Sequence, residues 1–311
     1  MKLRIGSRGS QLALWQTNHI SSLLRLQGHE VEIVIIKTTG DRLQEVTFAQ
    51  VGSKGMFTKE IEEALVEKRV DLAVHSLKDL PTELPEPFTI AATPPRVDPR
   101  DAFVSVNFAS LSDLPLGAHV GTSSQRRRAQ LKAIRPDIEV AEFRGNVETR
   151  LRKLAEGQVD AVLLAAAGLD RLEKTEWVRE RLEPADFCPA AGQGALAIEA
   201  RKDDAATIAA VAFLDDPATR FAVTVERAAL AALGGGCQVP IGVHCRPTLS
   251  DGDTFIEIFA VVADPLTGTA VRIYDCFPHA SDNVASLGQQ IAQKLIDAGA
   301  APLLAADRGS R

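Results

Sequence analysis

The pattern of apolar and polar positions repeats along the first two thirds of the chain. The first stretch predicts a strand, a small polar turn, a helix and a second strand, and later another helix that leads into a strand containing Val-Asp. These segments are residues 3–5, 6–10, 11–26, 31–37, 59–68 and 70–74.

The second stretch follows the same plan and again reaches a Val-Asp strand. Its segments are residues 119–120, 121–124, 125–134, 138–143, 147–155 and 159–163. Strands that alternate with helices indicate α/β units with mainly parallel strands. We therefore expect two similar lobes.

Two segments are predicted to cross between the lobes. Three prolines within residues 94–99 mark a linker or hinge. A second crossing is expected at residues 190–194, after which a strand at 195–199 returns to the first lobe.

The pattern changes after Pro217. A helix over 218–233, strands over 255–262 and 270–275, and a final helix over 283–298 predict a small α+β domain with an antiparallel sheet. The expected domains are residues 1–96 with about 195–214 as lobe 1, 97–194 as lobe 2, and 215–311 as the C-terminal domain.

Composition narrows the function classes. The chain has 311 residues and a formal net charge of −6, which disfavours a protein that coats nucleic acid. The sequence has no long apolar run and no signal peptide, so we expect a cytoplasmic protein with no membrane span. Its cysteines are then expected to be thiols. They are Cys188, Cys237, Cys245 and Cys276.

Both strand-to-helix turns place small polar residues at a helix N-terminus, where free N–H groups and the helix dipole favour an anion. Ordinary N-capping explains either turn taken alone. Because the two turns hold equivalent places in two lobes, we expect them to face each other across a cleft.

A basic cluster lies within residues 121–153, which carry nine basic and four acidic side chains in an acidic chain. Arginine suits paired contacts with carboxylates and phosphates. A solvated helix face is the alternative. Aromatic residues are not interleaved with the basic ones, which disfavours single-stranded nucleic acid.

Two single residues are candidates for chemistry. Asp79 follows a strand and is predicted to lie in the cleft, where a carboxylate can stabilise a cation or move a proton; a surface pair with Lys78 is the alternative. Cys237 follows three glycines, and a buried loop thiol is the simpler interpretation. His244 and Cys245 fit no standard zinc spacing, so no metal is expected.

Several motifs together resemble the porphobilinogen deaminase family, also called hydroxymethylbilane synthases. The matching segments span nearly the whole chain in family order. They are GSRGS at 6–10, LALWQ at 12–16, GSKGMFTKE at 52–60, AVHSLKD at 73–79, DPRDA at 98–102, GTSSQRR at 121–127, RGN at 144–146, TR at 149–150, GQG at 192–194 and GGCQVP at 235–240.

This resemblance implies a fold of two periplasmic-binding-protein-like lobes with a cleft between them and a small C-terminal domain. It also implies an enzyme of tetrapyrrole and haem biosynthesis, which joins four porphobilinogen units head to tail into hydroxymethylbilane and releases ammonia. The growing chain is built on a dipyrromethane cofactor that a thioether holds to the cysteine matching Cys237.

The resemblance assigns the remaining site residues. Asp79 matches the catalytic carboxylate. The expected cofactor-binding residues besides Cys237 are Ser76, Lys78, Thr122, Ser124, Arg126, Arg127, Arg144 and Gly145. The expected substrate-binding residues are Arg8, Ser10, Ser123, Arg150, Arg171 and Gln193.

We also form expectations about the oligomeric state, one loop and the rival function class. The resemblance implies a monomer whose partners are porphobilinogen and the linear pyrrole chain. The loop at 47–53 is expected to be a mobile lid, and Arg128 to face solvent. The rival class is a non-catalytic two-lobed anion-binding protein, which the missing export signal disfavours.

Overall fold

The computed structural model describes residues 1–42, 58–235, 239–250, 253–278 and 284–309. The first lobe is built on a five-stranded sheet with the order β2-β1-β3-β10-β4. Its strands are β1 (Lys2–Ser7), β2 (Glu30–Ile35), β3 (Leu72–Ser76), β4 (Phe88–Ala92) and β10 (Leu196–Arg201). Its helices are α1 (Gln11–Leu26), α2 (Thr39–Arg42), α4 (Lys59–Val66) and α8 (Ala205–Val211).

The second lobe repeats this sheet with the order β7-β6-β8-β5-β9. Its strands are β5 (Asp101–Val104), β6 (His119–Gly121), β7 (Glu139–Ala141), β8 (Ala161–Ala165) and β9 (Val178–Leu182). Its helices are α5 (Gln125–Ile134), α6 (Val147–Ala155) and α7 (Ala166–Arg171). In both sheets the first three strands are parallel and the fourth is antiparallel to its neighbours, which confirms the prediction of two related lobes.

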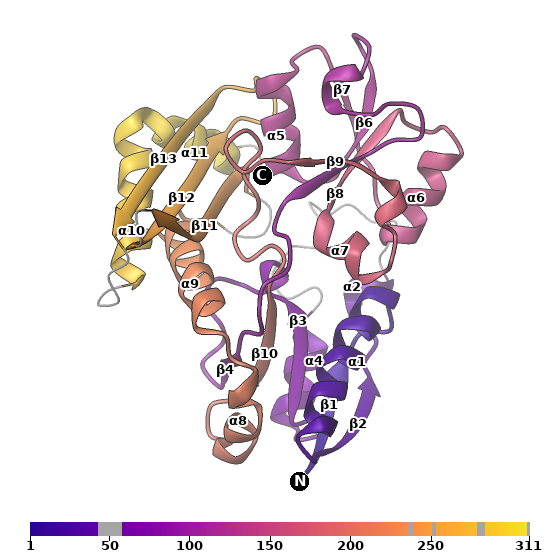
Figure 1. Ribbon diagram of the computed structural model, residues 1–311, viewed down its shortest axis with the longest axis vertical. Helices are drawn as coiled ribbons and strands as arrows, with labels where there is room; N and C mark the ends of the chain where they lie inside the picture. The colour runs from indigo at the N-terminus through magenta and orange to yellow at the C-terminus, as the bar shows by residue number, and fades with distance from the viewer. Residues whose placement is uncertain (43–57, 236–238, 251–252, 279–283, 310–311) are drawn as a thin grey trace.

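Two segments run between the lobes, after β4 and after β9, as the sequence predicts (Figure 1). The strand that follows each crossing becomes the antiparallel strand of its new sheet, so β10 does return to the first lobe. The crossings touch, because a Cβ on Gly194 would lie 2.6 Å from the carbonyl oxygen of Val97. Gly194 also has a φ of +87°, which favours glycine.

Helix α1 shows why the sequence pattern predicts the lobes well. Its buried positions are Gln16, Thr17, Ile20, Ser21 and Leu24, and the last four lie on one face of a helix with 3.6 residues per turn. Ser10 caps its first turn. Ile20 and Leu24 pack on the apolar face of the first sheet together with Leu3 and Ile5 of β1, so the helix lies flat against the sheet.

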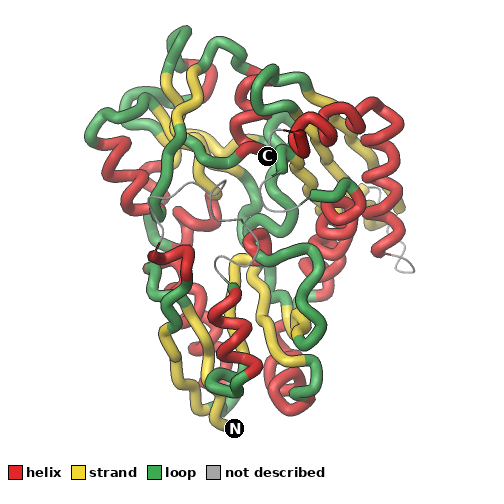
Figure 2. Tube along the Cα trace, turned by 180° about the vertical axis from the view of Figure 1, so that it is seen from behind, coloured by secondary structure: helices red, strands yellow, loops and turns green. Residues whose placement is uncertain are grey.

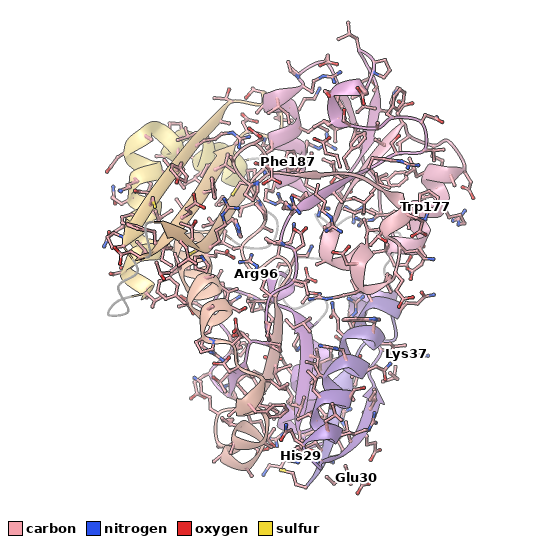
Figure 3. The ribbon with its side chains drawn as sticks, in the orientation of Figure 1. His29, Glu30, Lys37, Arg96, Trp177 and Phe187 are labelled. Atoms are coloured by element: carbon pink, nitrogen blue, oxygen red, sulfur yellow. The ribbon has the colours of Figure 1, made fainter. Side chains whose placement is uncertain are left out.

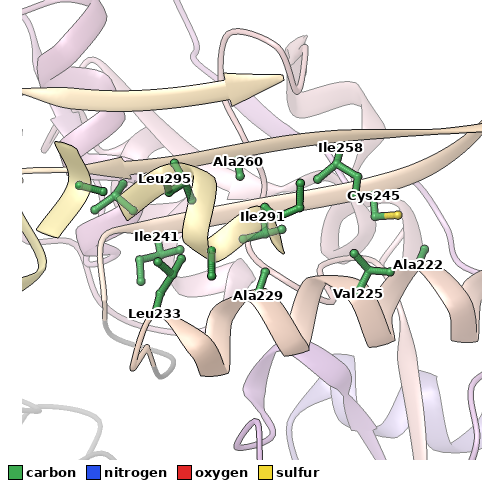
Figure 4. Packing of buried hydrophobic residues seen from close by; sticks show 14 of the residues in the cluster. Ala222, Val225, Ala229, Leu233, Ile241, Cys245, Ile258, Ala260, Ile291 and Leu295 are labelled. Carbon is green, nitrogen blue, oxygen red and sulfur yellow. The ribbon is translucent and has the colours of Figure 1, made fainter. Parts of the chain in front are cut away.

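The C-terminal part is a three-stranded antiparallel sheet of β11 (Ile241–Ser250), β12 (Asp253–Ala263) and β13 (Ala270–Pro278). Three helices accompany it: α9 (Pro217–Ala232), α10 (Val284–Leu295) and α11 (Ala301–Gly309). Val225 and Ala229 of α9, Ile291 and Leu295 of α10, and Ile258 of the sheet form its core (Figure 4).

The predicted final helix over 283–298 is wrong in its extent. Helix α10 ends at Leu295, a single wide turn follows at Ile296–Ala300, and α11 then runs to Gly309. Gly299 breaks the helical path because its φ is +100°. The other short turns are the 3₁₀ segments Leu77–Asp79, Leu111–Asp113, Thr175–Trp177 and Ala212–Leu214.

Viewed from behind, the tube trace shows the same three sheets, with the C-terminal part beside the second lobe and above the first (Figure 2). Among the described residues, Cys188, Cys245 and Cys276 are free cysteines. None of the described helices is long and apolar enough to cross a membrane.

Candidate active site

The carboxyl end of β3 carries the first group of site residues. The strand runs into the 3₁₀ turn Leu77–Asp79, in which Leu77 is buried, Lys78 is half-buried and Asp79 is exposed. Leu77 therefore anchors the turn while Asp79 faces outward. Asp79, Ser76, Arg8 and Ser10 line one small pocket of about 80 Å³, so the structure brings these four predicted residues together.

A buried carboxylate, Asp101, organises the second lobe's part of the site. One of its oxygens lies 2.7 Å from Nη1 of Arg126 and the other lies 2.7 Å from Nη2 of Arg127. Burial opposes ionisation of Asp101, but the two guanidinium groups hold the pKa of its carboxyl far below the usual range. Asp101 therefore fixes the two arginines in place. The sequence analysis missed this role, although the residue stands in the DPRDA segment.

Gln193 joins the two lobes at this point. Its Nε2 donates to the carbonyl of Pro99 at 2.7 Å and to Asp101 at 3.0 Å. Its Oε1 accepts from Nζ of Lys78 at 3.3 Å. One amide thus connects the turn that carries Asp79 with the carboxylate that holds Arg126 and Arg127.

The charged neighbours of Lys78 change the pKa of its amine. Burial and the nearby positive charges of Arg127 and Arg126 lower the pKa of its amine to about 8, although Asp79 and Asp101 oppose the shift. The negative charge of Asp79 acts to raise the pKa of the Arg127 guanidinium. The carboxyl end of β3 and the start of α5 therefore form one electrostatic site.

The two polar turns serve as helix caps. Ser10 accepts a hydrogen bond from the amide of Ala13, and Ser124 accepts one from the amide of Arg127. Thr122 is buried and accepts from the amide of Ser124, while the hydroxyl of Ser123 donates to the carbonyl of Phe143. Capping and ligand contact are compatible, because a cap satisfies only one of the free N–H groups. That the turns face each other stays a prediction.

Arg144 and Arg150 lie beside the N-terminus of α6. Arg144 forms an ion pair with Glu142 at 2.7 Å. Arg150 is different: its Nε is buried and has no hydrogen-bond partner among the described residues. Burial, together with the charges of Arg127 and Arg144, lowers the pKa of Arg150 to about 10. Glu142 opposes this shift, and a buried cation of this kind favours an anion bound beside it.

Gly145 between them has a φ of +124°, and a Cβ there would meet the side chain of Thr149 at 2.7 Å. This turn requires glycine. Arg128, expected to face solvent, is half-buried, with its guanidinium 4.0 Å from Glu142.

Arg171 lies where the second lobe meets α1. Its Nη2 donates to the carbonyl of Gly194 at 2.8 Å, and its guanidinium lies 6.0 Å from the ring of Trp15. The side chain is buried, its Nε has no partner among the described residues, and burial lowers its pKa to about 10.

Glu226 of α9 is a second residue that the sequence analysis missed. It is fully buried and accepts hydrogen bonds from Arg96, from the amide of Gly192 and from the amide of Cys245. Figure 3 shows Arg96 where the three parts of the molecule meet. Cys237 follows α9 in the sequence, but Cys237 itself and the loop at 47–53 lie outside the described residues.

Comparisons with known proteins agree with this geometry. Residues 3–209 match the family model "Porphobilinogen deaminase, dipyromethane cofactor binding domain", and residues 220–297 match "Porphobilinogen deaminase, C-terminal domain". The porphobilinogen deaminase of Chromobacterium violaceum is 48% identical over 307 residues, covering 98% of this chain and 97% of that protein. The enzyme of the same name from Trichlorobacter lovleyi is 50% identical over 305 residues, covering 97% and 96%.

Among solved structures, the methionine-binding protein MetQ is 12% identical with a TM-score of 0.44, covering 68% of this chain and 89% of that one. The family models and the full-length relatives are decisive. This chain belongs to the porphobilinogen deaminase family.

Proposed function

We propose that Asp79 is the working carboxylate of this enzyme. The reaction joins four porphobilinogen units head to tail into hydroxymethylbilane, with one ammonia released for each unit, in tetrapyrrole biosynthesis. One observation supports the proposal best: Asp79 interacts electrostatically with both Lys78 and Arg127. Lys78 belongs to the first lobe and Arg127 to the second.

The residues of this chain fit pyrroles that carry acetate and propionate side chains, as the dipyrromethane cofactor and the substrate both do. Such carboxylates bind well where a buried cation lacks an acceptor. Arg150 and Arg171 each bury a guanidinium Nε without a partner among the described residues, and the pKa of both is lowered. A bound carboxylate would supply the missing acceptor and offset the effect of burial on the two guanidinium groups. When bound, the cofactor supplies the pyrrole end to which substrate is joined.

Asp79 faces the reacting part of the substrate in this proposal. Departure of ammonia leaves a cation derived from the substrate, and an ionised carboxylate within the site stabilises that cation electrostatically. A pyrrole carbon must later lose a proton, and the same carboxylate can accept it. The exposed position of Asp79, at the end of a turn anchored by Leu77, suits both tasks.

The remaining predicted residues form two groups, one that binds the cofactor and one that binds the substrate. The residues proposed to bind the cofactor are Ser76, Lys78, Thr122, Ser124, Arg126, Arg127, Arg144 and Gly145, with Cys237 as the thioether attachment. Those proposed to bind substrate are Arg8, Ser10, Ser123, Arg150, Arg171 and Gln193. Arg126 and Arg127 already share Asp101, so they present a fixed positive edge to a ligand.

The domain limits belong to the same proposal. Residues 1–96 with 195–214 form lobe 1, residues 97–194 form lobe 2, and residues 215–311 carry the cofactor cysteine. The pairing of β10 with β3 and β4 supports the return to lobe 1. We further propose a cytoplasmic monomer that binds neither nucleic acid nor membrane. A non-catalytic anion-binding role is not favoured, because the curated full-length relatives are deaminases.

The direct test is product stoichiometry. Purified protein is incubated with porphobilinogen, and substrate, ammonia and hydroxymethylbilane are quantified over time. The proposal expects four substrate molecules consumed and four ammonia molecules released for each hydroxymethylbilane formed. Binding of porphobilinogen without ammonia release would favour the non-catalytic alternative.

A further inference from the structure

A buried histidine–glutamate pair lies behind the Asp79 pocket. Nε2 of His75, on β3, is 2.9 Å from Oε2 of Glu199, on β10. In the sheet register His75 is opposite Ala197 and Glu199 is opposite Ala73, so the two side chains project from one face of neighbouring strands. The exposed fractions are 7% for His75 and 0% for Glu199, which leaves only the histidine in reach of the pocket.

Glu199 depends on His75 for its hydrogen bonding. Its second oxygen, Oε1, is buried and has no hydrogen-bond partner among the described residues. Within the described part of the chain, His75 is the one basic side chain that pairs with Glu199. His75 is therefore the group through which the pair can exchange a proton.

The neighbouring element adds no positive charge. Glu62 on α4 is half-buried, and its pKa is raised by burial and by the negative charge of Glu199. Arg8 and Asp79 are the charged residues that line the pocket together with His75. His75 thus interacts with carboxylates of its own lobe and borders the pocket.

The pocket gives that proton a route. His75, Ser76 and Asp79 all line it, and its volume of about 80 Å³ has room for about two water molecules. Glu199 holds Nε2, so Nδ1 is the ring nitrogen that can exchange a proton with the pocket.

We propose that the His75–Glu199 pair is the second proton-holding group of the site and works alternately with Asp79. This inference rests on the function proposed above. When the C–N bond of the substrate breaks, its electron pair stays on nitrogen and ammonia leaves. Ammonia, a stronger base than imidazole, takes the Nδ1 proton of His75 through water in the pocket and departs as ammonium.

The pair is then restored within the same cycle. Asp79 accepts the proton that the pyrrole carbon loses, and passes it across the pocket to Nδ1 of His75. Each cycle thus moves one proton from carbon to ammonia and returns both groups to their starting state. Such a device suits an enzyme that repeats the same step four times.

The first experiment measures turnover of the His75→Gln variant. We expect kcat to fall roughly 10- to 100-fold, KM to stay within about twofold, and imidazole added to the buffer to restore kcat several-fold as an external proton carrier. His119→Gln, an exposed histidine that pairs with Glu139, should match wild type. His244→Gln is the buried control, since His244 also lies beside a buried glutamate, and its activity should not respond to imidazole.

The second experiment observes the proton itself. Nitrogen-15 NMR of the histidine rings at pH 7 should show both nitrogens of His75 protonated in wild type and one deprotonated in Glu199→Gln. A His75→Gln enzyme with kcat within twofold of wild type, a loss of kcat that imidazole does not restore, or a singly protonated His75 in wild type would each overturn the inference. Wild type that releases no ammonia would instead overturn the proposed function.

Discussion

The guanidinium of Arg96 donates two hydrogen bonds to the carboxylate of Glu226, at 2.6 and 3.1 Å. Arg96 belongs to the first crossing between the lobes, and Glu226 belongs to α9. The same carboxylate accepts from the amide of Gly192 in the second crossing at 2.7 Å. One buried group therefore ties both crossings to the C-terminal part.

This arrangement predicts a specific acid sensitivity. Burial opposes ionisation of Glu226, but Arg96 and His244 outweigh it and lower its pKa to about 2 from an ordinary value of 4.5. A lowered pKa stabilises the fold above pH 4.5, and this contribution is lost as the pH falls toward 2. The difference corresponds to roughly 3 kcal/mol. Urea unfolding should show Glu226→Gln less stable than wild type at pH 7, with the gap closing below pH 4.5.

Glu86→Gln, an exposed change, is the control and should track wild type at every pH. A gap between Glu226→Gln and wild type that stays constant down to pH 2 would contradict the assignment.

Asp101 predicts a second stability effect. Asp101→Asn leaves Arg126 and Arg127 buried without their shared carboxylate, and an uncompensated buried charge costs roughly 3–5 kcal/mol. Thermal unfolding followed by circular dichroism should detect this loss. Asp203→Asn, at an exposed position, should change stability by less than about 0.5 kcal/mol. Equal melting temperatures for the two variants would exclude the role given to Asp101.

The charge of Lys78 should make cofactor acquisition depend on pH. Because its pKa is lowered to about 8, the amine is charged below pH 8 and neutral above it. If Lys78 holds a carboxylate of the cofactor, cofactor-free protein should acquire the dipyrrole up to about tenfold more slowly at pH 9, where about nine tenths of the amine is neutral, than at pH 7. Lys78→Arg keeps its charge, so its rate, followed by intact mass, should stay nearly flat over this range. Parallel rate curves for the two proteins would show that Lys78 does not carry this dependence.

Asp79 predicts a purely chemical defect. Asp79→Asn should fold normally and still carry the dipyrrole mass, yet lose at least about 100-fold in kcat, because no carboxylate remains to stabilise the cation or accept the proton. Steady-state kinetics, circular dichroism and intact mass measure the three properties, with Asp203→Asn as the matched control. Near-normal turnover of Asp79→Asn would remove the residue from the mechanism.

The sequence predicts the longer helices well, but it misses the short helices α7 and α8 as well as several strands. Helices α1 and α6 begin and end where their apolar periodicity and their caps, Ser10 and Asn146, place them. Strands β5 and β9 were not predicted, because β5 is a short, fully buried run without alternation. Strand β11 was missed as well: it contains Pro247, which an edge strand tolerates but which lowers the strand signal.

The same limit applies to the site. Local patterns identify Asp79, which follows a strand, and the basic cluster at 121–153 as candidates. Lys78, Arg8 and Arg171 come only from the family resemblance. Local patterns cannot reveal Asp101, His75 or Glu226 in their roles, because each acts through a partner 25 to 130 residues away. Such pairings exist only once the sheets have formed, so the fold itself creates them.

The most direct test of the whole account is the intact mass of the purified protein, followed by peptide mapping, from cells in which porphobilinogen is available. The account predicts a mass excess equal to one dipyrromethane, located on the peptide that contains Cys237. An unmodified thiol at Cys237 in protein of full length would contradict it.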